Sequence, residues 1–360
     1  MSEYSQRLTQ TLRQKILDIF TPLVPRDRPF VLIDFPDAAN SGDHAIWLGE
    51  KAFFKDLGVE PAYQCSMQSY DRAEMTRALA DGVIFMHGGD NFGDAYIYHE
   101  FRHQVLLDFP DNEVVIFPQT VMFYSDPKLL GSVEQFARHG KVTIAARDAL
   151  SFHVLEKFFG SHCKIIMAPD MAYMLGPQRR NGNANFEVLW LSRTDSEGVH
   201  GGNIAKVVNL PNLGQVTANL GQFVDRIETV ALADVSGSKL IVTDWYRCQF
   251  ANQAGVDAYR NLSLDQQSKF WVDRALTLLS SGSVVITDRL HAHILCTLVG
   301  IPHILLNNVY GKNISFYETW SRPLDVCHLA SSPEHAWGIA QDFLKRVATQ
   351  RAQQETRPVA

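Results

Sequence analysis

Short apolar runs alternate with helix-forming segments along most of the chain, and this alternation limits the fold more than any other feature. The first run, Phe30-Val31-Leu32-Ile33, follows proline-rich breakers and indicates a buried strand. Strands that alternate with helices are typical of parallel βαβ units. The same reasoning predicts strands at residues 82–86, 114–117 (ended by 118–120), 142–145, 164–167, 188–191, 239–243, 283–287 and 304–306, and helices at 7–20, 45–57, 75–80, 96–108, 130–139 and 151–159.

Length and patterning predict two domains. The chain has 360 residues, more than one hydrophobic core usually serves. Residues 176–187 are rich in Gly, Asn and Arg, and we interpret them as a linker. We therefore predict an α/β fold with two Rossmann-like domains, 1–178 and 188–345, facing a central cleft. Residues 195–222 have weak periodicity and are expected to form a long loop.

Composition excludes several functional classes. Lys plus Arg is 33 against 39 for Asp plus Glu, so we expect no nucleic-acid partner. The five cysteines are scattered without a C-x-x-C pair, which argues against disulfides and a cysteine zinc site and fits a reducing compartment. Neither a signal peptide nor the ~18 continuous apolar residues of a spanning helix is found. We expect a cytoplasmic protein that can still contact a membrane surface peripherally.

Two polar loops follow predicted strands in the first half, where parallel sheets bind their ligands. The loop 40–43 is a candidate pocket wall, although Ser41 or Asp43 can equally cap the next helix. The loop 87–94, HGGDNFGD, has glycines that let the backbone approach a ligand, and the helix after it favours an anion. It does not match the dinucleotide fingerprint and also fits a tight turn. Its first residue, His87, fits a packed histidine equally well.

The densest group of functional side chains is 287–293, TDRLHAH, at a strand-to-helix turn. One acid, one guanidinium and two imidazoles can converge there on one ligand, and the alternative is a capped helix with a buried ion pair. His291 and His293 point to different helix faces, so they do not suit one metal, and we expect none.

Two further cations follow predicted strands. Arg147 has a planar fork suited to a carboxylate or phosphate of a ligand, or to a salt bridge with the adjacent Asp148 or another carboxylate of the chain. Lys312 lies beside Gly311 and can reach a phosphate or remain solvated.

Taken together, these loops resemble the polysaccharide pyruvyl transferase family. The resemblance spans most of the chain in the expected order. This chain has Asp90 where the family pattern often has a third glycine. The matching pieces are N-S-G-D-H (40–44), H-G-G-D-N-F-G-D (87–94), F-P-Q-T (117–120), A-R-D (146–148), A-P-D-M-A (168–172), T-D-R-L-H (287–291) and Y-G-K-N (310–313).

The resemblance implies both a fold and a reaction. The fold would be similar to that of GT-B glycosyltransferases. The reaction would take phosphoenolpyruvate as donor substrate, without a cofactor, and form a 4,6- or 3,4-linked pyruvate ketal. The acceptor would be a glycan of an exopolysaccharide or capsule, or a lipid-linked oligosaccharide precursor.

The resemblance also places functional residues. The family's histidine and arginines fall on His87, Arg147, Arg289 and His291. We expect catalytic roles for His87, His291 and Asp288. The residues expected to bind substrate are Asn40, Gly42, Asp43, Gly88, Gly89, Asn91, Arg147, Arg289 and Lys312.

The chemistry of these residues is compatible with that reaction. A donor with a phosphate and a carboxylate calls for at least two cationic contacts. Ketal formation requires protonation of the donor methylene and removal of a hydroxyl proton, and histidine suits both. Phosphate departure leaves a cationic centre that Asp43, Asp94 or Asp288 can stabilise.

Two other functions remain open from the sequence. One is a glycosyltransferase that uses a nucleotide sugar on the same architecture. The other is a catalytically silent carbohydrate-binding or assembly protein. The concentration of Arg, His and Asp at strand ends weighs against the silent protein.

Overall fold

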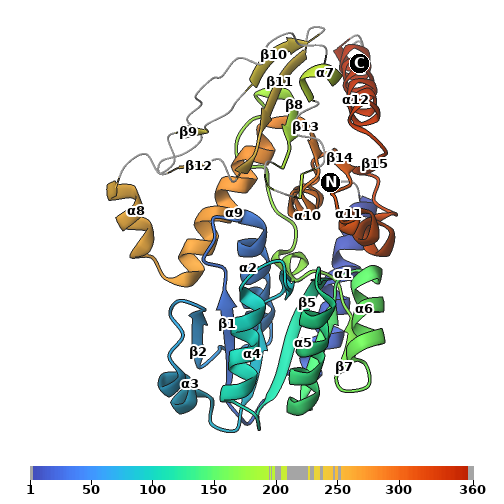
Figure 1. The fold of residues 1–360 in the computed structure, drawn as a ribbon. Helices are drawn as coiled ribbons and strands as arrows, with labels where there is room; N and C mark the ends of the chain where they lie inside the picture. The colour runs from blue at the N-terminus through green and yellow to red at the C-terminus, as the bar shows by residue number, and fades with distance from the viewer. Residues whose placement is uncertain are drawn as a thin grey trace.

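The computed structural model describes most of the chain, and the predicted loop at 195–222 lies largely outside the described residues. Two parallel-stranded sheets with helices around them give a Rossmann-like α/β fold (Figure 1). No helix in the described ranges is both long and apolar enough to cross a membrane. The described residues are 3–193, 195, 197–198, 204–208, 226–227, 231–235, 238–245, 248–249 and 253–355.

The first sheet has seven parallel strands in the order β2-β1-β3-β5-β6-β7, with β4 beside β5. Its strand β1 is buried along its whole length, as expected for a parallel sheet covered on both faces. The strands are β1 (Phe30–Phe35), β2 (Tyr63–Ser66), β3 (Val83–Met86), β4 (Gly89–Gly93), β5 (Glu113–Met122), β6 (Val142–Ala146) and β7 (Lys164–Met167). The helices of this half are α1 (Glu3–Phe20), α2 (Ser41–Asp56), α3 (Arg72–Leu79), α4 (Tyr98–Asp108), α5 (Asp126–His139) and α6 (Ala149–Phe159), with short 3₁₀ turns η1 (Thr21–Leu23) and η2 (Met171–Leu175).

The second sheet has six strands in the order β10-β11-β8-β13-β14-β15, and only β10 runs antiparallel to its neighbour. The strands are β8 (Phe186–Leu191), β10 (Ala231–Val235), β11 (Ser238–Thr243), β13 (Gly282–Thr287), β14 (His303–Leu306) and β15 (Cys327–Ala330), and β9 (Arg226–Ile227) pairs separately with β12 (Cys248–Gln249). The helices are α7 (Ile204–Val207), α8 (Gln253–Arg260), α9 (Leu264–Ser280), α10 (Leu290–Val299), α11 (Lys312–Phe316) and α12 (Pro333–Glu355), with a π-helical turn η4 (Tyr317–Ser321).

The strand order reverses once in each sheet. In the first sheet β2 lies on one side of β1 and β3 on the other. In the second sheet β11 lies on one side of β8 and β13 on the other. A reversal of this kind opens a crevice beyond the carboxyl ends of the two strands, where α/β proteins bind ligands. The loops after β1, β3, β8 and β13 therefore lie where each sheet is built to hold a ligand.

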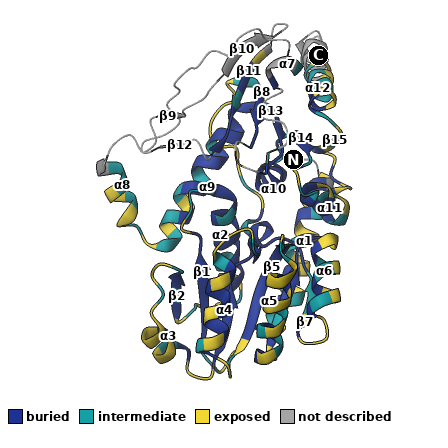
Figure 2. Cartoon of the chain, viewed as in Figure 1, coloured by how far each residue is buried: buried dark blue, intermediate teal, exposed yellow. Residues whose placement is uncertain are grey.

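One apolar cluster continues from the first half of the chain into the second. It contains Trp47 and Phe53 of α2 together with Leu279 of α9 and Leu295 of α10. Figure 2 shows buried residues running through α2 and α10 between the sheets. Trp47 Nε1 also donates a hydrogen bond of 3.0 Å to Asp265 of α9. The halves are thus joined by a common core as well as by the connection at 176–185.

Two predictions about the strands of the first half are wrong. The loop predicted at 87–94 contains strand β4. Strand β5 does not end at Pro118 but continues to Met122. The pairing of β5 with β6 shifts between Ile116 and Gln119, and this irregularity accommodates a proline that has no N–H to donate.

Candidate functional site

Residues from both strand-order reversals line one pocket of about 330 Å³, a volume in the range of small-molecule sites. The first half contributes a set of carboxamides, carboxylates and tyrosines, and the second half contributes cations, carboxylates and an imidazole. The lining includes Asn40, Asp43, Asp90, Asn91, Tyr96 and Tyr98 from the first half and Arg193, Asp195, Glu197, Trp245, Arg289, His291 and Lys312 from the second.

His291 lies at the start of α10, beside two residues of the first half. Its Nε2 is 3.3 Å from Asp170 Oδ2 and 3.5 Å from Arg147. Burial alone would raise the pKa of Asp170, but His291 and Arg147 hold it well below its usual range. An ionised carboxylate only accepts hydrogen bonds, so the proton of a neutral His291 is on Nε2. Nδ1 is then the nitrogen that can accept a proton.

Gly42 makes room for that imidazole. A Cβ added at Gly42 would lie 2.4 Å from His291 Nδ1 and 2.7 Å from its Cγ, far inside van der Waals contact. The main-chain N–H of Gly42 is bound by the cap of α2, Asn40 Oδ1, at 3.2 Å. The N–S–G–D loop therefore places a residue without a side chain against Nδ1 of His291.

Arg147 is fully buried and does not line the pocket, but it contacts residues that do. Its guanidinium donates to Asp170 at 2.9 Å and to Thr120 Oγ1 at 2.9 Å, and it is bonded to Asp90. Arg147, which we predicted to bind substrate, therefore lies beside the pocket without lining it.

Arg289, at the N-cap of α10, is a cation that the second half contributes to the pocket. Its Nε and one terminal nitrogen donate to the two oxygens of Asp244 at 2.6 and 2.7 Å, a bidentate pairing that fixes the guanidinium plane. The guanidinium also lies 5.4 Å from the centroid of the Trp245 ring. Arg289 is thus oriented before any ligand enters.

Lys312 joins the two sides. Its ammonium is bonded to Asp90 of the first half and to Glu197 of the second. Glu197 also accepts from Arg193 at 3.0 Å and from Tyr96 at 2.9 Å. Burial lowers the pKa of Lys312 to about 8, although Glu197 beside it has the opposite effect. Every cation at the pocket is therefore already bonded to a carboxylate of the chain.

Besides Gly42 and Arg147, four of the predicted site residues do not line the pocket. His87 is fully buried and its Nδ1 is 2.9 Å from Glu50 Oε2. Burial alone would lower the pKa of His87, but Glu50 raises it. Gly88 N donates to the same Glu50 at 2.8 Å, and Gly89 begins β4 with φ +118°, a conformation that favours glycine. Asp288 is also buried, accepts from Arg193 N at 2.8 Å, and has its pKa raised by burial to about 6.

The remaining predicted residues line the pocket: Asn40, Asp43, Asn91, Arg289, His291 and Lys312. The sequence interpretation missed Arg193, Asp195 and Glu197 from the loop after β8, and the partners Asp170 and Asp244. The first group had the same signal as the others, polar residues at the end of an apolar strand. Asp195 and Glu197 were missed because residues 195–222 were interpreted as a long loop, and Arg193 was not singled out although it directly follows the predicted strand.

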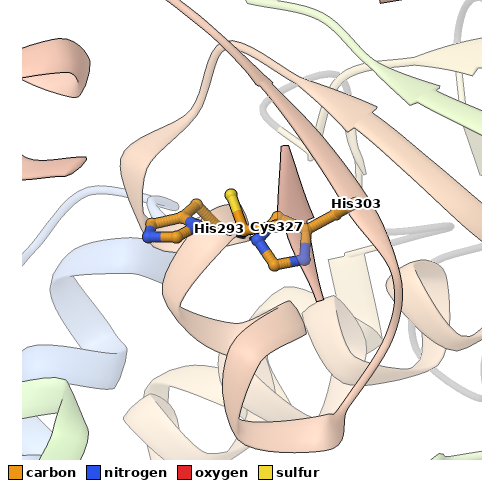
Figure 3. Close-up of side chains that lie close together, drawn as sticks. All are labelled: His293, His303 and Cys327. Carbon is orange, nitrogen blue, oxygen red and sulfur yellow. Dashed lines mark hydrogen bonds between the residues drawn. The ribbon is translucent and has the colours of Figure 1, made fainter. Parts of the chain in front are cut away.

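His293 points away from this pocket, as its spacing from His291 predicts. It forms a buried group with His303 of β14 and Cys327 of β15 (Figure 3). His303 Nδ1 must donate to the Ile301 carbonyl, at 2.8 Å, so its Nε2 accepts from His293 Nδ1 at 2.7 Å. Two nitrogens bound to one tetrahedral zinc would lie about 3.3 Å apart. The observed geometry is therefore that of a hydrogen-bonded pair of neutral imidazoles.

This pair should make the protein less stable in mild acid. Burial lowers the pKa of His303 to about 4 from its usual 6.5. Between these pH values His303 binds a proton in the unfolded chain but stays neutral in the folded protein. The contribution of His303 to folding stability is therefore present above pH 6.5 and is lost as the pH falls towards 4. We expect the gap in unfolding free energy between wild type and His303→Gln to shrink by about 2 kcal/mol from roughly pH 7.5 to 5 in urea titrations. A difference in unfolding free energy that does not change with pH would contradict the burial of a neutral His303.

The profile of the polysaccharide pyruvyl transferase family matches residues 40–308. Pyruvyl transferase 1 of Schizosaccharomyces pombe is 32% identical over 301 residues, covering 80% of this chain and 69% of the relative. Putative pyruvyl transferase EpsO of Bacillus subtilis is 26% identical over 315 residues, covering 86% of this chain and 90% of the relative.

A solved structure supports the fold. An uncharacterized protein of Klebsiella pneumoniae superposes with a TM-score of 0.52 at 17% identity, covering 92% of this chain and 100% of that one. At this identity the likeness concerns the fold alone. The family match extends over the loops after β1, β3, β6, β8 and β13, which carry most of the pocket residues. On the extent of that match and the identity to its relatives, the chain belongs to the polysaccharide pyruvyl transferase family.

Proposed function

We propose that this protein transfers the pyruvyl group of phosphoenolpyruvate to two hydroxyls of one sugar, forming a pyruvate ketal and releasing phosphate. The observation that carries the proposal is the convergence of Arg289, His291 and Lys312 on one pocket, with Arg147 3.5 Å from His291. These residues come from two segments of the second half, after β13 and after β14, and from one segment of the first half, after β6. A family of pyruvyl transferases needs such a site for a small, highly anionic donor.

The cations match the two anionic ends of the donor. Arg289, whose plane is fixed by Asp244, suits a carboxylate or phosphate bound through two parallel hydrogen bonds. Lys312, at the start of α11, supplies a point charge for the second anionic group of the donor. Because both cations are paired with carboxylates in the free protein, donor binding exchanges one set of anions for another. This exchange favours a ligand with several negative charges over a singly charged one.

The reaction balances as two additions to one carbon. A sugar hydroxyl adds to C2 of the donor while a proton is delivered to the methylene carbon, which becomes the methyl group. The C2–O bond to phosphate then breaks, the phosphate leaves with its electron pair, and the second hydroxyl bonds to C2. The two hydroxyl protons end on the methyl carbon and on phosphate.

We assign the proton transfers to His291, whose Nε2–H is held by Asp170 while Nδ1 exchanges the proton. Asp170 is then a positioning residue. His87 is better placed to position than to react, since it and Glu50 hold the backbone of Gly88 from behind the pocket. Asp288 likewise accepts a hydrogen bond from the backbone N–H of Arg193, and we assign it a positioning role.

The architecture fits this proposal. We propose two Rossmann-like domains on either side of the connection at 176–185, with the pocket between them as in GT-B glycosyltransferases. The acceptor would be a glycan or a lipid-linked oligosaccharide, the latter brought by peripheral contact with a membrane.

The test is incubation of the purified protein with phosphoenolpyruvate and a glycan panel. We expect phosphate release that depends on a glycan, together with a mass gain in the glycan equal to that of pyruvate minus water. Release of a nucleotide from nucleotide sugars, with none of the first products, would instead identify a glycosyltransferase. Neither product with any glycan would reject the proposed reaction.

Gly42→Ala should lower kcat strongly without removing donor binding. The added methyl group would overlap His291 Nδ1, so the imidazole must rotate away from Asp170 or the loop must move. We expect a loss of about 10²-fold in kcat, as for a misplaced acid/base group. Ala45→Gly, one turn further along α2, is the control for disturbance of the helix. An unchanged kcat in Gly42→Ala would show that the position of His291 is not critical.

A further inference from the structure

A second, smaller pocket adjoins the first and has a different chemistry. Its volume is about 60 Å³, against about 330 Å³ for the first. Both pockets are lined by Asp90, Tyr96, Glu197 and Lys312, so a ligand in one can touch a ligand in the other. The remaining lining includes Tyr124 and Tyr310.

Two of the three tyrosines of this pocket are exposed to solvent, and the third, Tyr310, is half-buried. Tyr96 is 44% exposed and Tyr124 60% exposed, unusual values for large aromatic side chains. Tyr124 follows β5 in the first half and Tyr310 follows β14 in the second. Their hydroxyls are hydrogen-bonded at 2.5 Å and their rings meet edge to face, with centroids 6.0 Å apart. Residues of both halves thus form one aromatic rim beside the anion-binding pocket.

The charges of the second pocket favour a neutral ligand rich in hydroxyls. Among its described lining residues Lys312 is the one cation, and it is already bonded to Asp90 and Glu197. The proposed function uses Lys312 for the donor in the first pocket, so an anionic ligand in the second pocket would face Asp90 and Glu197 without a cation of its own. Sugar hydroxyls can donate hydrogen bonds to these carboxylates, while the C–H face of a pyranose packs on an aromatic ring.

We propose that the rim of Tyr124 and Tyr310 and the pocket below it bind the acceptor sugar, a neutral hexopyranose. This inference rests on the proposed function, which places the donor in the neighbouring pocket. The small volume admits the hydroxyl-bearing edge of one sugar, and the rest of the glycan lies across the exposed rings. Asp90 is then located where an acceptor hydroxyl meets the donor.

The experiment uses the full chain and methyl glycosides of glucose, galactose, mannose and N-acetylmannosamine. Saturation-transfer NMR without donor reports sugar binding, and phosphoenolpyruvate-dependent phosphate release reports turnover. In Tyr124→Ala and Tyr310→Ala we expect the saturation-transfer signal to vanish and the KM for the sugar to rise about 10-fold or more, with the KM for phosphoenolpyruvate changed less than about twofold.

Controls separate the ring from its hydroxyl and from general damage. Tyr124→Phe keeps the ring and should retain sugar binding. Ile97→Ala, an equally exposed apolar residue outside both pocket linings, should behave as wild type. Sugar binding lost only in the Ala variants, but with no turnover in wild type, would support the sugar site and reject pyruvyl transfer. Turnover with an unchanged sugar KM in both Ala variants, or no binding by any glycoside, would overturn the inference.

Discussion

An Arg289→Lys variant is expected to lose about 10³-fold in kcat/KM for phosphoenolpyruvate, the scale of losing a preorganised electrostatic contact to the donor. The guanidinium is oriented by two hydrogen bonds to the fully buried Asp244. Lysine keeps the charge but supplies neither the planar fork nor the bidentate fit. The measurement is initial-rate phosphate release over a range of donor concentrations.

Two controls test whether the loss in Arg289→Lys comes from donor binding. Arg322→Lys alters an exposed arginine paired only within its own turn to Glu318, and should leave the rate unchanged. The melting temperature of Arg289→Lys shows whether Asp244 still has its partner, because an unpaired buried carboxylate would destabilise the fold. A folded Arg289→Lys protein within threefold of wild-type kcat/KM would remove Arg289 from donor binding.

His291→Asn should show the second large effect, a fall in kcat of roughly 10²- to 10⁴-fold with a much smaller change in the donor KM. Asparagine is similar in size and polar, but it cannot carry a proton between hydroxyl and methylene. Quenched-flow or steady-state phosphate release with saturating donor measures the loss directly.

The partner of His291 gives a further readout. Asp170→Asn should lower kcat by less than His291→Asn, and the two changes together should be no worse than His291→Asn alone, because Asp170 acts through the histidine. His328→Asn, on an exposed position of β15, serves as control. Losses that multiply in the double variant would show that Asp170 has a role of its own.

The sequence indicates which loops lie near one another. It indicates much less well which of their residues line the pocket and which are buried beside it. Arg289, His291 and Lys312 line one pocket because polar residues directly after an apolar parallel strand lie at the ligand-binding edge of the sheet. That rule does not say which side of the turn a side chain occupies. His87 and Arg147 satisfy it equally, yet both are fully buried.

The carboxylate partners could not be predicted for a different reason. Asp170 lies in one of the pieces that carry the family resemblance, and Asp244 directly follows a predicted strand, but neither was assigned a role. Their importance comes from contacts with His291 and Arg289, which lie 121 and 45 residues away in the chain. Such pairs depend on how the two sheets are set against each other. Strand β4 was missed similarly, because glycine and aspartate disfavour strands by themselves and pairing with β5 outweighs that preference.

The apolar cluster shared by α2, α9 and α10 has a consequence for how this enzyme can be dissected. A fragment ending near residue 178 would leave Trp47 without its partner Asp265 and without the second-half part of this cluster, and a fragment beginning near residue 188 would leave Leu279 and Leu295 without the first-half part. Calorimetry of the intact chain should accordingly give a single cooperative heat-absorption peak, and neither fragment should accumulate as a monodisperse species when expressed alone.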